Sequence, residues 1–154
     1  MKVFISYSTA ADQIIALRLQ TIAAVYGMTI YVPPATTRHV ASPELIPEVQ
    51  RQLNESDVVL AVITHEPVSS AISEMNWALA SGKLLIPIVS PGVPQEYYAR
   101  FEPYFIVNLA DPSQTEQQIV RFLAEKHESE KGKTALIGLA IFATALLLFG
   151  ADSK

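Results

Sequence analysis

Apolar residues in this chain occur either in short continuous runs or in longer stretches where they recur every three or four positions. The short runs predict buried strands, whereas the longer period predicts helices. The predicted strands cover residues 3–7, 28–32, 57–64, 84–89 and 104–109. The predicted helices lie between residues 12 and 27 and over residues 44–56, 69–81 and 114–128. This alternation predicts an α/β fold with an open five-stranded parallel sheet of the flavodoxin-like kind and helices on both faces.

The apolar stripes of two helices predict their buried sides. In the first helix the stripe consists of Ile14, Leu17, Ile22 and Val25. In the helix over residues 69–81 it consists of Ile72, Met75 and Leu79. Ser69 or Ser70 is the expected N-cap of that helix, and Glu74 lies roughly opposite its apolar stripe. Periodicity alone therefore favours an ordinary solvated glutamate at position 74.

The order of the elements changes this interpretation of Glu74. The most apolar strand, residues 57–64, is expected at the centre of the sheet. Open parallel sheets bind ligands beyond the carboxyl ends of their strands, at the point where the strand order reverses. The segments expected at that edge are residues 6–8, 33–39 and 65–70, and Glu74 follows the last of them. We therefore expect Glu74 at the rim of a ligand crevice.

Composition excludes several kinds of chemistry. The chain has no cysteine, so it has neither disulfides nor a catalytic thiol, and its net charge of −4 argues against nucleic acid as a partner. Neither a Rossmann glycine fingerprint nor a phosphate-binding P-loop is present. His39, His65 and His127 stand apart in sequence, so we interpret them as loop or surface residues and predict no metal site.

A single acidic residue can still support one kind of glycosidic cleavage. Ordinary glycoside hydrolysis needs two carboxylates, because the leaving oxygen must be protonated. Nicotinamide in NAD⁺ is already a cationic pyridinium and leaves as a neutral base. One glutamate that binds the ribose hydroxyls and stabilises the positive charge developing at the sugar is then sufficient.

The motifs of the chain resemble those of a TIR (Toll/interleukin-1 receptor) domain of the NAD⁺-consuming type. The resemblance covers about residues 1–125 and is carried by five sequences in a fixed order. These are VFISYS at 3–8, YVPP at 31–34, SDVVLAVIT at 56–64, the S-x-x-x-E of Ser70 and Glu74, and ALASGKLLIPIV at 78–89. The compact chain is most similar to bacterial antiviral-defence members of that family.

The resemblance implies a role for several residues. Glu74 would be the catalytic residue, and NAD⁺ would be the substrate, with no further cofactor. Ser6, Tyr7 and Ser8 would line the NAD⁺ pocket, together with Pro33, Arg38 and Ser70. The segment from Pro33 to Pro43 would be a mobile loop that gates the pocket and mediates assembly.

Two residues near the motif have alternative interpretations. Arg38 either pairs with a phosphate or is simply solvated. Many eukaryotic TIR domains have tryptophan where this chain has Ser70. Trp77, three residues after Glu74, either supplies the missing aromatic surface or packs in the core, and core packing is the simpler interpretation.

The last part of the chain predicts a membrane anchor. Residues 134–150 contain no charge over 17 positions, which is just long enough for a membrane-spanning helix. A charged linker at 126–133 precedes them. Four of the eleven lysines and arginines lie shortly before the apolar run and only Lys154 follows it, so we expect the TIR domain in the cytoplasm and a single-pass C-terminal anchor. The alternative is an apolar helix used in soluble oligomerisation.

These observations favour a membrane-anchored NAD⁺ glycohydrolase or cyclase of bacterial immune defence, activated by self-association through the TIR domain and the tail helix. The alternative is a non-catalytic TIR scaffold that binds other TIR domains through residues 33–43 at the membrane. Two further hypotheses are an enzyme resembling nucleoside deoxyribosyltransferases and a protein whose tail helices disrupt membranes.

Overall fold

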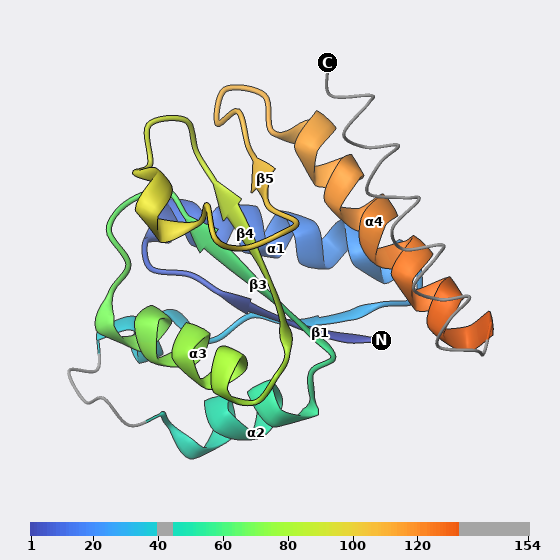
Figure 1. Cartoon of the computed structure of the whole chain (residues 1–154), viewed down its shortest axis with the longest axis horizontal. Coiled ribbons are helices and arrows are strands. Elements are labelled where there is room, and N and C mark those ends of the chain that lie inside the picture. The colour runs from blue at the N-terminus through green and yellow to red at the C-terminus, as the bar shows by residue number, and fades with distance from the viewer. Residues whose placement is uncertain (40–44, 133–154) are drawn as a thin grey trace. The chain divides into compact units, whose positions relative to one another are not determined.

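A computed structural model describes residues 1–39 and 45–132 of the chain (Figure 1). The chain divides into two compact units, Met1–Leu109 and Ala110–Lys154. The described part of the second unit consists of residues 110–112 and one helix, α4 (Ser113–Gly132). Residues 126–132 of the predicted linker belong to this helix, and residue 133 lies outside the described residues. The predicted transmembrane segment 134–150 and residues 40–43 of the predicted gating loop lie outside the described residues. Within residues 1–39 and 45–132, no helix has the length and apolar character needed to span a bilayer.

The first unit alternates strands and helices as predicted. Its strands are β1 (Lys2–Ser6), β2 (Thr29–Tyr31), β3 (Val58–Ile63), β4 (Leu84–Val89) and β5 (Phe105–Ile106). Its α-helices are α1 (Ala10–Val25), α2 (Pro47–Glu55) and α3 (Ser69–Ala80), and its 3₁₀ turns are η1 (Ala35–His39) and η2 (Gln95–Tyr97). All strand pairs are parallel, and the strand order is β2-β1-β3-β4-β5. This order is flavodoxin-like, and the fully buried β3 lies at the centre, so both predictions are confirmed.

The helices lie on both faces of the sheet. Helix α1 packs on one face, and α2 and α3 lie side by side on the other (Figure 1). Side chains alternate between the faces of a strand, so Phe4 and Ser6 of β1 share one face. Phe4 belongs to the core beneath α2 and α3, together with Leu53 of α2 and Ala78 of α3. Ser6, the last residue of β1, is thereby directed toward α3 at the carboxyl edge of the sheet.

The predicted buried side of α1 is wrong. Ile14 is 60 % exposed and Val25 is 82 % exposed, whereas Ala16 and Leu19 are fully buried. Apolar residues occur all around this helix, so their spacing does not select one side. The small side chain of Ala16 lets the helix backbone approach the sheet closely, which a stripe of larger residues would prevent.

Helix α3 also differs from its prediction. Ile72 and Leu79 are exposed, and the buried residues are Ser70, Ala71, Glu74 and Ala78. Their spacing of four places Ser70, Glu74 and Ala78 on one side, which faces the sheet. The N-cap is Val68, which makes no side-chain cap bond, so neither Ser69 nor Ser70 caps the helix. The Ser70 hydroxyl is used in the site described next.

Candidate active site

Glu74 lies inside the protein, above the carboxyl end of β1. Its side chain is 1 % exposed, so the interpretation as a solvated glutamate is wrong. The Ser6 hydroxyl donates a hydrogen bond to Glu74 Oε1 at 2.6 Å. Since these residues are 68 positions apart in sequence, the sheet topology brings them together, as expected from the carboxyl-edge rule.

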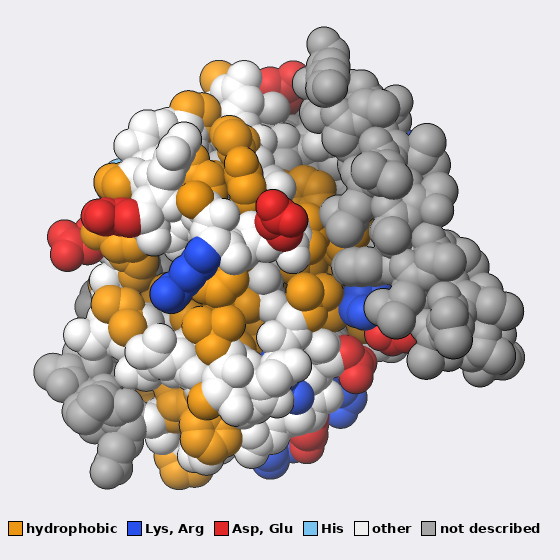
Figure 2. All heavy atoms as spheres, viewed as in Figure 1, with side chains coloured by type: hydrophobic (Ala, Val, Ile, Leu, Met, Phe, Trp, Pro, Cys, Tyr) orange, Lys and Arg blue, Asp and Glu red, His pale blue; other side chains and the backbone are white. Residues whose placement is uncertain are grey.

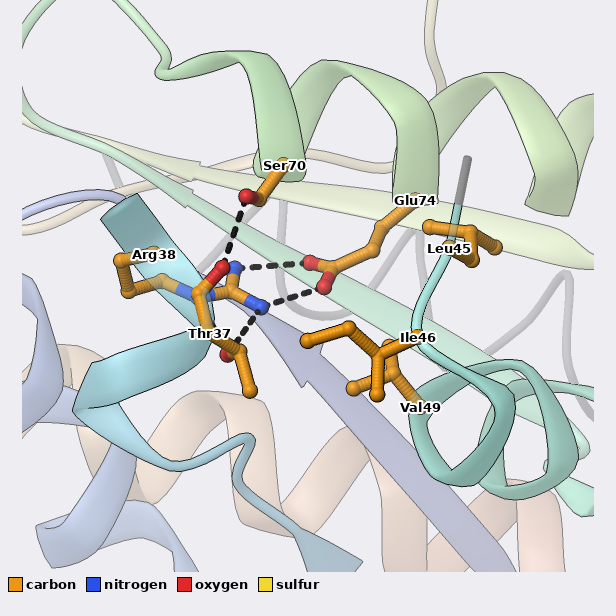
Figure 3. A pocket seen from close by; sticks show the side chains of 7 residues that line it. All are labelled: Thr37, Arg38, Leu45, Ile46, Val49, Ser70 and Glu74. Atoms are coloured by element: carbon orange, nitrogen blue, oxygen red, sulfur yellow. Dashed lines mark hydrogen bonds and ion pairs between the residues drawn. The ribbon is translucent and has the colours of Figure 1, made fainter. Parts of the chain in front are cut away.

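Arg38 forms a bidentate ion pair with Glu74 (Figure 3). Its Nη1 donates to Glu74 Oε1 at 2.9 Å, and its Nη2 donates to Oε2. The arginine comes from η1 and is 4 % exposed, so the interpretation as a solvated loop residue is wrong. Two parallel charge-assisted hydrogen bonds are the strongest geometry for an arginine–carboxylate pair.

The remaining donors of Arg38 are also satisfied. Nη1 donates to the Tyr7 carbonyl at 2.8 Å, and Nε and Nη2 donate to Thr37 Oγ1 at 3.1 and 3.0 Å. The guanidinium carbon lies 4.8 Å from the centre of the Tyr7 ring, which adds a cation–π contact. The Thr37 hydroxyl in turn donates to the Pro34 carbonyl at 2.7 Å. Arg38 is thus fixed by its own turn and by the loop after β1.

Two further hydrogen bonds attach η1 and the preceding prolines to the body of the unit. The Ser70 hydroxyl donates to the Thr37 carbonyl at 2.8 Å, and the Tyr7 hydroxyl donates to the Pro33 carbonyl at 2.5 Å. Burial raises the pKa of the Tyr7 hydroxyl above its ordinary value; Arg38 opposes this rise and Glu74 reinforces it. Tyr7 therefore serves as a neutral donor that holds the segment in front of Arg38.

The predicted site residues thus fall into three groups. Ser6 and Arg38 contact the Glu74 carboxylate directly. Tyr7, Pro33 and Ser70 position the segment that carries Arg38. Ser8 contacts the start of α3 instead, where its hydroxyl oxygen accepts the Val68 backbone N–H at 3.0 Å.

Sequence reasoning missed Thr37. It singled out no residue at that position, although Thr37 accepts two hydrogen bonds from Arg38. The sequence did contain a signal for Thr37. It is a short polar residue between Pro34 and Arg38, and such residues favour tight turns in which the side chain hydrogen-bonds nearby groups.

A small cavity of about 10 Å³ adjoins the carboxylate (Figure 3). It is lined by Thr37, Arg38, Leu45, Ile46, Val49, Ser70 and Glu74. A volume of this size holds at most about one water molecule. Every buried side-chain polar atom in residues 1–39 and 45–132 has a hydrogen-bond partner. In this conformation the space beside Glu74 is therefore too small for a ligand larger than water.

The described residues around the Glu74 carboxylate do not form a metal site. Among the residues that the structure describes, no group of three or more histidine, cysteine or acidic side chains could hold a metal ion. Trp77 packs partly buried against the core beneath α2 and α3, and its Nε1 donates to Asn54 Oδ1 at 2.9 Å. The expected core packing of Trp77 is thus confirmed for part of its surface.

Comparison with known proteins gives neither a matching family model nor a matching curated protein. The resemblance to TIR domains accordingly rests on the motifs quoted above.

Proposed function

We propose that this chain is a TIR-type NAD⁺ glycohydrolase or ADP-ribosyl cyclase in which Glu74 is the catalytic residue. The observation that carries the proposal is a buried carboxylate at the carboxyl edge of a flavodoxin-like sheet, held by an arginine from a short turn. Such edges are where open parallel sheets bind nucleotides. Charged side chains are rarely fully buried unless they are paired, so a buried glutamate at such an edge is a candidate for function.

In the proposed reaction, Arg38 first leaves Glu74 and the carboxylate accepts hydrogen bonds from the hydroxyls of the nicotinamide ribose. The bond between ribose C1′ and the ring nitrogen breaks, and its electron pair leaves with neutral nicotinamide. The Glu74 carboxylate stabilises the positive charge that develops at C1′. Water then adds to C1′ and loses a proton to solvent; in the cyclase, a nucleophile within ADP-ribose takes the place of water.

Arg38 has a proposed role in both conformations. In the closed state it neutralises Glu74 and fills the space beside it. After it withdraws, its planar guanidinium suits the pyrophosphate of NAD⁺, because arginine binds phosphate oxygens in the same bidentate manner as a carboxylate. Substrate binding would then exchange one anionic partner of Arg38 for another.

Self-association and membrane attachment complete the proposal. We infer that residues 134–150 anchor the protein with its TIR domain in the cytoplasm, and that the anchor raises the local concentration of the domains. Assembly would supply the free energy that separates Arg38 from Glu74. The physiological result would be NAD⁺ depletion, or an ADP-ribose signal, during bacterial immune defence.

A nicotinamide-release assay tests the catalytic role of Glu74. We expect the wild type to release nicotinamide from NAD⁺ at high protein concentration and Glu74→Gln to lose at least 99 % of that activity. Glu66→Gln is the matched control, because Glu66 is an exposed glutamate in the loop after β3. The double variant Arg38→Met with Glu74→Gln leaves no unpaired buried charge and must be equally inactive. Equal rates for wild type and the Glu74 variants would remove the mechanism.

One observation favours a second candidate, the non-catalytic scaffold. The ion pair has all its hydrogen bonds made and leaves only about 10 Å³ of free volume, as a purely structural pair also would. In that case the chain would bind other TIR domains without turnover. Retained self-association with no nicotinamide release, in detergent and in membranes alike, would select the scaffold.

A further inference from the structure

A second and much larger hollow lies in the same unit, between α2 and α3. Its volume is about 730 Å³, which is within the usual range for small-molecule sites. Leu45 and Gln50 line it from the side of α2, and Ser73, Asn76 and Trp77 line it from α3. Figure 2 shows the face of the molecule that carries these helices, where apolar and uncharged polar atoms prevail. We call this hollow the α2/α3 groove.

The side chains of the α2/α3 groove suit a flat, uncharged heteroaromatic group. No charged side chain lines it, and Trp77 supplies an aromatic surface. The hydrogen bond from Trp77 Nε1 to Asn54 Oδ1 fixes the orientation of the indole before any ligand arrives. Gln50 and Asn76 each carry both a donor and an acceptor. Carboxamides of this type pair with the N6 and N7 edge of adenine, and aromatic side chains stack on bases.

The α2/α3 groove adjoins the closed site. Leu45 lines both the groove and the small cavity beside Glu74, so the two spaces share this side chain. On α3, Trp77 follows Glu74 by three residues, which is about 4.5 Å along the helix axis. A ligand that passes Leu45 from Glu74 therefore arrives at Trp77.

We propose that the α2/α3 groove binds the adenine end of the dinucleotide whose nicotinamide ribose lies at Glu74. This inference rests on the proposed function for the identity of the substrate. NAD⁺ has two aromatic ends joined by a pyrophosphate. The α2/α3 groove would take the adenine end, and the space beside Glu74 would take the nicotinamide ribose once Arg38 withdraws. Arg38, once released from Glu74, lies beside the path between them and meets the pyrophosphate.

Fluorescence provides a test that needs no turnover. Trp77 is the only tryptophan of the chain, so its emission reports on the groove alone. We expect AMP to quench the full-length protein in a saturable manner, and nicotinamide mononucleotide and ribose 5-phosphate to leave the emission unchanged. Asn76→Ala should weaken the binding of AMP about tenfold, and Gln50→Ala should do the same. Gln52→Ala is the matched control, because Gln52 lies on α2 outside the groove and donates to Glu48.

Kinetics then separate this inference from the proposed function. Asn76→Ala should raise KM about tenfold for NAD⁺ and leave turnover of nicotinamide mononucleotide, which lacks adenine, unchanged. Glu74→Gln should abolish turnover of both. Saturable quenching by AMP in a protein without turnover would support the groove and overturn the proposed function.

Three results would overturn the inference. AMP and ribose 5-phosphate could quench equally, or AMP could leave the emission unchanged. Alternatively, Asn76→Ala could reduce turnover of both substrates equally and weaken self-association, which would show that the α2/α3 groove is a contact between copies of the chain.

Discussion

Replacing Arg38 with alanine removes the cation from a buried ion pair and leaves the rest of the site in place. Glu74 then keeps one hydrogen-bond donor, the Ser6 hydroxyl, for a carboxylate that is almost fully buried. The substitution also removes the hydrogen bond from Arg38 to the Tyr7 carbonyl and the contact with the Tyr7 ring. Its effect on the free energy of unfolding therefore measures how strongly the closed state depends on the pair.

The expected loss is about 3 kcal/mol. Breaking a buried ion pair by removing one partner costs roughly 3–5 kcal/mol, because an uncompensated charge remains inside the protein. The lower end applies here, since the volume of the missing side chain joins the existing cavity and together they admit water to Glu74. Combining Arg38→Met with Glu74→Leu removes both charges, and we expect that variant to be close to wild type in stability.

Urea unfolding followed by circular dichroism measures these differences. A double-mutant cycle over Arg38→Ala and Glu74→Ala should give a coupling energy of about 2–3 kcal/mol. Arg51→Ala is the matched control, because Arg51 forms a comparable pair with Glu48 at 2.6 Å on the exposed surface of α2. Exposed pairs contribute little to stability, so this variant should unfold almost as the wild type does. Equal losses for Arg38→Ala and Arg51→Ala, or additive effects of the two buried substitutions, would refute the reasoning.

Two further predictions concern packing and pH. Leu19→Ala should lower the free energy of unfolding by about 2–5 kcal/mol, because Leu19 is fully buried on α1. Leu17→Ala should lower the free energy of unfolding by less than about 1 kcal/mol, because Leu17 is 44 % exposed. Equal losses for the two variants in urea unfolding would show that α1 buries the side predicted from sequence. Burial raises the pKa of Tyr7 above its ordinary 10.0, so the unfolded chain loses this proton at a lower pH than the folded chain does. The resulting stabilisation is complete below pH 10.0 and is lost as pH rises through the folded pKa, so Tyr7→Phe should flatten the alkaline decline in the free energy of unfolding. An unchanged slope for that variant would show that Tyr7 ionises in the fold as it does in the unfolded chain.

The strands were predictable because a strand that is buried on both faces is a continuous run of apolar residues in the sequence. Residues 58–63 are all apolar and all buried, and their composition placed them at the centre of the sheet. The meeting of Ser6 and Glu74 was predictable for a related reason, since parallel strands deliver their carboxyl ends to one edge. Both inferences need only the order of elements and no knowledge of side-chain partners.

The buried side of a helix was not predictable where apolar residues occur all around the helix, or where a buried polar residue pairs with a residue far away in the sequence. Helix α1 has apolar residues all around, and the fit of Ala16 and Leu19 to the sheet decided its orientation. Helix α3 turns a carboxylate inward, which is favourable only because Arg38 neutralises it from 36 positions away. A helical wheel evaluates each helix alone, so it assigned Glu74 to solvent.

The cost of the closed state also limits how the proposed enzyme could be activated. Moving a two-state equilibrium from 1:99 to 99:1 requires about 5.5 kcal/mol of differential binding. Separating a buried arginine–carboxylate pair costs a few kcal/mol, and a pyrophosphate bound by Arg38, as proposed, would return part of it. The remainder is within reach of a contact between two domains held at high local concentration by a membrane anchor. In the proposed mechanism the ion pair of Arg38 and Glu74 would set a threshold rather than a permanent block: a solitary domain would stay closed, and assembly together with substrate would open it.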